Sequence, residues 1–87
     1  MAEYTVEVLS TAQKELKWLA PAVVERVYSR LEALRSNPRP PGCKKVKGGE
    51  KEWRIRVGEY RIVYTVDDPK RQVEVTRIRH RSEVYRR

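Results

Sequence analysis

Residues 53–64 read Trp-Arg-Ile-Arg-Val-Gly-Glu-Tyr-Arg-Ile-Val-Tyr, and this stretch decides the fold. Apolar residues recur at every second position on both sides of Gly58-Glu59, which is typical of β-strands with one buried face. Two connecting residues that begin with glycine favour a tight hairpin turn, and such a turn places Arg56 opposite Arg61. We therefore predict a hairpin whose apolar side chains face a core: Trp53, Ile55, Val57, Tyr60, Ile62 and Tyr64.

The opposite face of this hairpin carries arginines. Arg54, Arg56 and Arg61 share it with Val63 and Thr65, and we expect it to be open to solvent or ligand. Like charges on paired strands destabilise the pair unless an anion lies between them, and guanidinium groups bind phosphate well. A basic strand face is often merely solvated, but three arginines on one face of a tight hairpin favour a phosphate site.

The composition also indicates an anionic partner. The 87 residues include 20 Lys and Arg against 12 Asp and Glu, which gives a formal net charge of +8. Nucleic acid is the leading candidate for such a partner. The lone Cys43 excludes an internal disulfide, and the sequence shows neither a signal-like nor a membrane-spanning apolar run. We expect one cytoplasmic domain that covers residues 1–87.

The remaining sequence predicts an α+β fold. Residues 3–9 alternate as a strand, and residues 10–19 and 21–36 have helical periodicity, with Ser10 and Gln13 as a capping box. Residues 38–52 form a basic loop rich in Pro and Gly, and residues 72–79 form a last strand with a bulge between Val75 and Ile78. We expect an N-terminal strand, a helical hairpin and a mainly antiparallel twisted sheet with the helices packed on one face.

These segments resemble a known family. The strand-helix-helix opening, the hairpin and the closing Arg-His-Arg-Ser-Glu-Val-Tyr of residues 79–85 are similar to the RelE branch of the RelE/ParE toxin superfamily. The resemblance implies an endoribonuclease that enters the ribosomal A site and cuts mRNA there. It also implies two partners: the 70S ribosome with its mRNA, and an acidic antitoxin that holds the toxin inactive.

The resemblance assigns site residues by position. The paired basic residues of the first hairpin strand fall on Arg54 and Arg56, that of the second strand on Arg61, the arginine that opens the closing motif on Arg79, and the terminal aromatic on Tyr85. The best-studied pattern has lysines where this chain has Arg54 and Arg56. Because arginine does not lose its proton, neither residue can act as a general base here.

The expected chemistry is attack of a 2′-hydroxyl on the adjacent phosphate, which needs a proton acceptor, a proton donor and cations. The arginines supply the cations. His80 is the single histidine, and imidazole ordinarily titrates near neutral pH; Tyr85 is the other candidate base, and it is equally suited to stack on a nucleobase. No metal-ligand spacing or cofactor motif is present, so we expect no metal or cofactor. Five further residues are expected to bind RNA: Lys44, Lys45, Lys47, Arg77 and Arg81.

Two other functions fit this fold. A ParE-like toxin would inhibit DNA gyrase by binding protein, although the retained Arg61, Arg79 and Tyr85 argue against it. A noncatalytic RNA-binding or partner-binding domain is the third reading, because the arginines at 54 and 56 depart from the nuclease pattern.

Trp18 lies away from the apolar stripe of its helix, so it contacts either the neighbouring helix or a partner.

Overall fold

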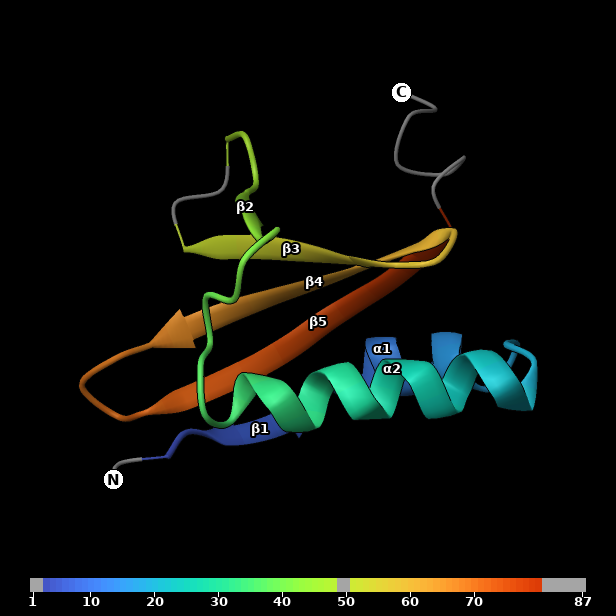
Figure 1. Cartoon of the computed structure of the whole chain (residues 1–87), viewed down its shortest axis with the longest axis horizontal. Helices are drawn as coiled ribbons and strands as arrows, with labels where there is room; N and C mark the ends of the chain where they lie inside the picture. The colour runs from blue at the N-terminus through green and yellow to red at the C-terminus, as the bar shows by residue number, and fades with distance from the viewer. Residues whose placement is uncertain (1–2, 49–50, 81–87) are drawn as a thin grey trace.

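The computed structural model describes residues 3–48 and 51–80 as a five-stranded sheet with two helices (Figure 1). The strand order in the sheet is β1-β5-β4-β3-β2, and all pairs are antiparallel except β1 with β5. The α+β class predicted from the sequence is confirmed. The elements are β1 (Thr5–Val8), α1 (Ser10–Leu16), α2 (Pro21–Leu34), β2 (Lys44–Lys45), β3 (Glu52–Val57), β4 (Tyr60–Asp67) and β5 (Gln72–His80).

The central hairpin has the register that the turn predicted. Arg56 pairs with Arg61, and Gly58 has a φ of +58°, a left-handed conformation that glycine adopts without strain. The last strand contains the expected irregularity, since the β4–β5 register shifts between Val63 and Tyr64. Thr76 is the extra residue on β5, and its hydroxyl donates a hydrogen bond to the Val63 carbonyl. The bulge therefore fixes which face each later residue of β5 occupies.

α1 continues the line of β1 along β5. The Thr11 hydroxyl donates to the Thr76 carbonyl, and the Ile78 N–H donates to Glu15 Oε1 at 2.6 Å, so the helix satisfies backbone groups that β1 is too short to reach. The predicted capping box is wrong. Ser10 lies inside the helix, and the Gln13 side chain donates to the Val8 carbonyl because it reaches back to the end of β1.

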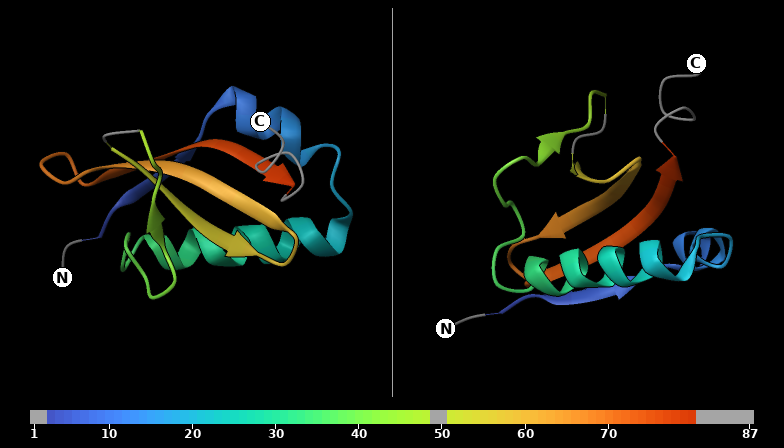
Figure 2. Two further views of the ribbon diagram at one scale, coloured as in Figure 1. Left: turned by 90° about the horizontal axis from the view of Figure 1, so that it is seen from above. Right: turned by 45° about the vertical axis from the view of Figure 1, so that its right-hand side comes forward.

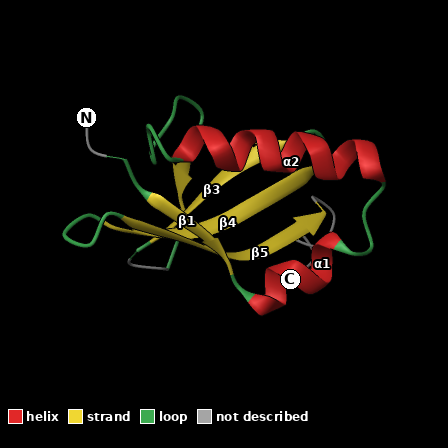
Figure 3. Cartoon of the chain, turned by 90° about the horizontal axis from the view of Figure 1, so that it is seen from below, coloured by secondary structure: helices red, strands yellow, loops and turns green. Residues whose placement is uncertain are grey.

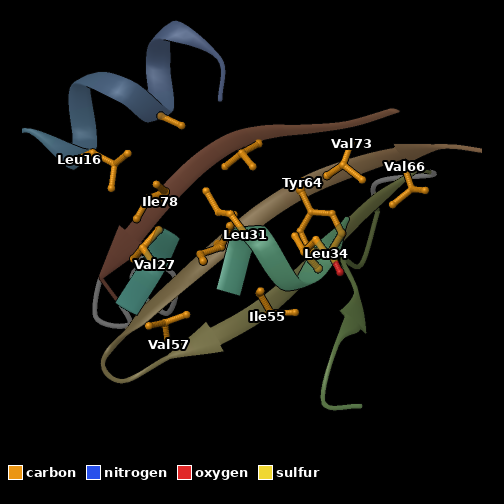
Figure 4. Close-up of a cluster of buried hydrophobic side chains, with 13 residues drawn as sticks. Leu16, Val27, Leu31, Leu34, Ile55, Val57, Tyr64, Val66, Val73 and Ile78 are labelled. Atoms are coloured by element: carbon orange, nitrogen blue, oxygen red, sulfur yellow. The ribbon is translucent and has the colours of Figure 1, made fainter. Parts of the chain in front are cut away.

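α2 crosses the sheet and covers its apolar face, whereas α1 lies beside β5 (Figures 2 and 3). Pro21 begins the helix, as its fixed φ favours. Val27, Leu31 and Leu34 point into the core, where Figure 4 shows them against Ile55, Val57 and Tyr64. The predicted core face of the hairpin is confirmed: Ile55, Val57, Ile62 and Tyr64 are buried, and Trp53 and Tyr60 pack against them half-buried.

The loop between α2 and β2 is pinned to the sheet. The buried Tyr64 hydroxyl donates to the Pro38 carbonyl at 2.7 Å, and burial raises the pKa of this phenol. Arg39 donates to both carboxylate oxygens of Asp68, at 3.2 and 2.8 Å, and the Tyr4 hydroxyl donates to the same group at 2.6 Å. The hydrogen bond from the Arg39 guanidinium is the main cause that lowers the pKa of Asp68, and the hydrogen bond from the Tyr4 hydroxyl is the second. These contacts hold the chain that leads to β2.

Candidate nucleic-acid interface

Three arginines form a row across the middle of the sheet. Arg56 on β3 pairs with Arg61 on β4, and Arg61 pairs with Arg79 on β5. Neighbouring strands lie about 4.8 Å apart, and directly paired residues share a face, so the three side chains leave the sheet on one side. We call Arg56, Arg61 and Arg79 the arginine row. The sequence left the face of Arg79 open, and the bulge at Thr76 places it here.

A second row lies two residues along the same face. It contains Arg54 and Arg77, with Val63 between them on β4. The two arginines differ in what they contact. Arg77 donates from Nε and Nη2 to Glu15 Oε2 at 3.1 and 2.9 Å, so it joins α1 to β5. Arg77 therefore makes a structural contact, and its contact with RNA stays a prediction.

Exposure corrects one expectation for this face. Arg61 was expected to be open to solvent, but only 6% of it is exposed. At Arg61, β4 is paired on both sides, with β3 and β5, whereas the short β2 pairs only with Trp53 and Arg54 and leaves β3 unpaired on one side at Arg56. Arg56 is exposed, and Arg54 and Arg79 are half-buried. Cations taken partly out of water interact more strongly with an anion than fully solvated ones do.

A cleft of about 410 Å³ opens beside the row. Arg30 reaches it from α2, and its Nη1 donates to the Arg56 carbonyl at 3.1 Å. The sequence analysis missed Arg30, because nothing in helical periodicity tells which exposed residue of α2 meets the edge of β3. The cleft is lined by Arg30, Gly42, Lys44, Arg54, Ile55, Arg56 and Arg61.

The predicted RNA-binding lysines are divided between two surfaces. Lys44 pairs with Arg54 and lines the cleft. Lys45 pairs with Trp53, and its Nζ lies 5.9 Å from the centre of the Trp53 ring, so it belongs to the other face. Lys47 is exposed in the turn that follows. Arg81 and Tyr85 lie outside the described residues.

His80 lies on the face opposite Arg79. It pairs with Tyr60, and the two rings meet edge to face with their centres 5.2 Å apart. Ile78, two residues earlier on β5, is buried in the core on this same face. The imidazole therefore lies on the opposite face of the sheet from the arginine row.

No helix in the described part of the chain is long and apolar enough to cross a membrane. Residues 3–48 and 51–80 bring no three His, Cys, Asp or Glu side chains together in a group suited to a metal ion. Trp18 is 88% exposed just after α1, so it does not pack against the neighbouring helix, and its contact with a partner stays a prediction.

Comparison with known proteins identifies the family. A sequence model of the ParE toxin of type II toxin–antitoxin systems, parDE, matches residues 2–85. The chain is 33% identical to the toxin RelG of Mycobacterium tuberculosis, with 97% of this chain and 98% of RelG covered. The chain belongs to the RelE/ParE superfamily of type II toxins. A putative toxin RelE1 of Methanocaldococcus jannaschii is 29% identical, and 97% of each chain is covered.

Solved structures agree with this family and with the fold. A double arginine-to-alanine variant of E. coli toxin RelE in the free state matches with a TM-score of 0.78 and 31% identity, covering 98% of this chain and 92% of that one. The toxin of the intact E. coli RelBE toxin–antitoxin complex matches with a TM-score of 0.77 and 28% identity, covering 88% and 95%. The sheet and helices described above are therefore those of RelE-type toxins.

Proposed function

We propose that this RelE-type toxin is an endoribonuclease that cleaves mRNA in the ribosomal A site. The observation that carries the proposal is the arginine row, in which three guanidinium groups on adjacent strands share one face. Attack of a 2′-hydroxyl on the neighbouring phosphate gathers negative charge on the phosphate oxygens. Fixed cations lower the energy of that transition state because they need no reorganisation when the charge develops.

Each arginine has a distinct part in this scheme. Arg61 is held from the central strand and is nearly buried, so its interaction with a phosphate would be weakly screened. Arg56 is exposed and reaches the phosphate from the edge. Arg79 completes the row from β5, and Arg54 extends it along β3. None of them accepts a proton at neutral pH, so the row stabilises charge and the base is another group.

For the base, we propose Tyr85 rather than His80. The imidazole of His80 is against Tyr60 on the opposite face from Arg79. Tyr85 belongs to the closing motif through the family resemblance, and a phenolate beside several guanidinium groups would be stabilised by them. Alignment by the ribosome supplies the remaining acceleration, since correct placement of nucleophile and leaving group contributes roughly 7–11 kcal/mol.

An acidic antitoxin is the proposed protein partner, and the cytoplasm, where ribosomes work, is the proposed site of action. Structures of related toxins include RelBE complexes from E. coli and M. tuberculosis at 28% and 29% identity. A formal net charge of +8 on 87 residues gives this chain the complementary charge. Binding would stabilise the folded toxin by mass action.

The test is an in vitro translation reaction with primer extension to map cuts in the mRNA. Wild-type protein should produce cuts at ribosome-bound codons, and Arg56→Gln should reduce them about 100-fold. Lys70→Gln removes the same charge from the exposed turn at the far end of β4 and should cut like wild type. Absence of cleavage by folded wild-type protein on active ribosomes would refute the nuclease assignment.

A gyrase-inhibiting toxin is the second candidate, because the matching family model is that of ParE toxins. A DNA supercoiling assay with purified gyrase distinguishes the two. The nuclease should leave supercoiling unchanged at concentrations that abolish translation. Inhibited supercoiling with intact mRNA would instead support the ParE-like function. If the protein inhibits neither supercoiling nor translation, a noncatalytic binding domain is favoured.

A further inference from the structure

The cleft beside the arginine row is larger than the row itself requires. Arg56 and Arg61 form only part of its wall, which continues to Arg30 on α2 and Lys44 on β2. These two residues come from elements outside the central hairpin. The cleft volume of about 410 Å³ lies within the range of small-ligand sites.

Arg30 is held in place at this cleft. Its Nη1 donates to the Arg56 carbonyl, which fixes the guanidinium to the backbone of β3. A guanidinium has five N–H donors, so this bond leaves donors for a ligand. Part of the side-chain entropy that binding would cost has already been lost in the free protein.

The opposite wall is open and basic. Lys44 is exposed and directly paired with Arg54, so both project to the cleft side. Gly42 also lines the cleft, with a φ of +93°. A Cβ placed there would meet no atom within 4 Å, so the space beside Gly42 is unoccupied. No Asp or Glu of the described residues lines the cleft. By contrast, Arg39 and Arg77 elsewhere on the surface bond to carboxylates.

We propose that Arg30 and Lys44 bind a second phosphate of single-stranded RNA, next to the phosphate bound by the arginine row. The inference rests on the proposed nuclease function and extends its substrate site. An RNA strand carries a phosphate at every nucleotide, so a phosphate held by Arg56 and Arg61 has a neighbour one nucleotide away. The cleft is continuous with that position and supplies two further cations there.

The test measures binding to a short, labelled, single-stranded RNA with 2′-methoxy riboses, which cannot be cleaved, by fluorescence anisotropy. For single strands the slope of log affinity against log salt is about −0.7 for each phosphate neutralised. Arg30→Gln should make the slope shallower by about 0.7. Between 50 and 200 mM salt the wild-type affinity should then fall about 2.6-fold more than that of the variant. Lys44→Gln should have a similar effect.

Arg26→Gln is the matched control. It removes the same charge from the same helix one turn earlier, where the guanidinium lies over Gly58 and does not line the cleft. Its slope should equal that of wild type, and Arg30→Lys, which keeps the charge, should retain most of the slope. Circular dichroism melting checks that each variant is folded.

Several results would overturn the inference. Equal slope changes in Arg26→Gln and Arg30→Gln would reduce the effect to net charge, and no binding by wild type at 50 mM salt would remove the site altogether. If Arg30→Gln weakens binding of a poly-glutamate peptide but not of RNA, the cleft serves a carboxylate partner. The assay contains no ribosomes and no cleavable bond, so a failure of the nuclease proposal would leave its result unaffected.

Discussion

Replacing Tyr64 with phenylalanine should destabilise the fold although only one oxygen atom is lost. The ring is fully buried, and its hydroxyl donates to the buried Pro38 carbonyl at 2.7 Å. In Tyr64→Phe that carbonyl loses this donor in a site that water does not reach. Leaving a buried acceptor unsatisfied costs about 1–3 kcal/mol. For a domain of this size each kcal/mol lowers the Tm by about 4–8 °C, so we expect a decrease of at least about 4 °C.

Tyr28→Phe is the control for this change. Tyr28 is 51% exposed on α2, so the same deletion there should alter the free energy of unfolding by no more than about 0.5 kcal/mol. Thermal melts followed by circular dichroism measure both variants. If the Tm of Tyr64→Phe lies within 1 °C of wild type, the hydroxyl does not pin the loop and the reasoning fails.

The same hydroxyl predicts a dependence on alkaline pH. Burial raises the pKa of Tyr64 in the folded protein, while in the unfolded chain the phenol ionises at about 10. Above that pH the unfolded state binds fewer protons than the folded state, so stability falls as pH rises. The Tm of wild type should therefore decrease more steeply between pH 9 and 11 than that of Tyr64→Phe.

Three further predictions concern the site and its support. Arg61→Lys keeps the charge but loses the planar guanidinium, so primer extension should show mRNA cleavage reduced about tenfold or more, and a wild-type rate would mean that charge alone suffices. Asp68 has a lowered pKa, so its contribution to stability is present above about pH 3.9 and lost below it; acid melts of Asp68→Asn should lack this loss, and parallel curves would contradict it. Tyr85→Phe should slow single-turnover cleavage more than His80→Gln does, and the reverse order would make the histidine the base.

Local patterns in the sequence were enough to predict the hairpin. The alternation of residues 53–64 and the Gly58-Glu59 turn determine both the core face and the opposition of Arg56 and Arg61, because a two-residue connection allows one register. The apolar stripe of α2 was equally legible, since Val27, Leu31 and Leu34 follow helical periodicity. These features depend only on neighbours that are close in the sequence.

The rest of the site depends on contacts between distant segments. The faces of Arg79 and His80 follow from the bulge at Thr76, which the slipped alternation indicated without assigning sides. The burial of Arg61 follows from the place of β4 in the strand order. Arg30 belongs to the site because α2 packs on the sheet and brings its guanidinium to the Arg56 carbonyl of β3. The periodicity of a single segment cannot predict contacts between segments that lie far apart in the sequence.

The parallel pairing of β1 with β5 affects how the toxin is made. Thr5 is joined in register to Gln72, which lies far along the sequence from it, so β1 finds its partner only after β5 has been synthesised. Pairings of such large sequence separation form late, because a long loop must be closed before they contribute stability. Arg79 lies on that same strand, so a nascent chain that stops before β5 lacks both the closing strand and one member of the arginine row. Translation of the toxin therefore passes β5 before the row can assemble.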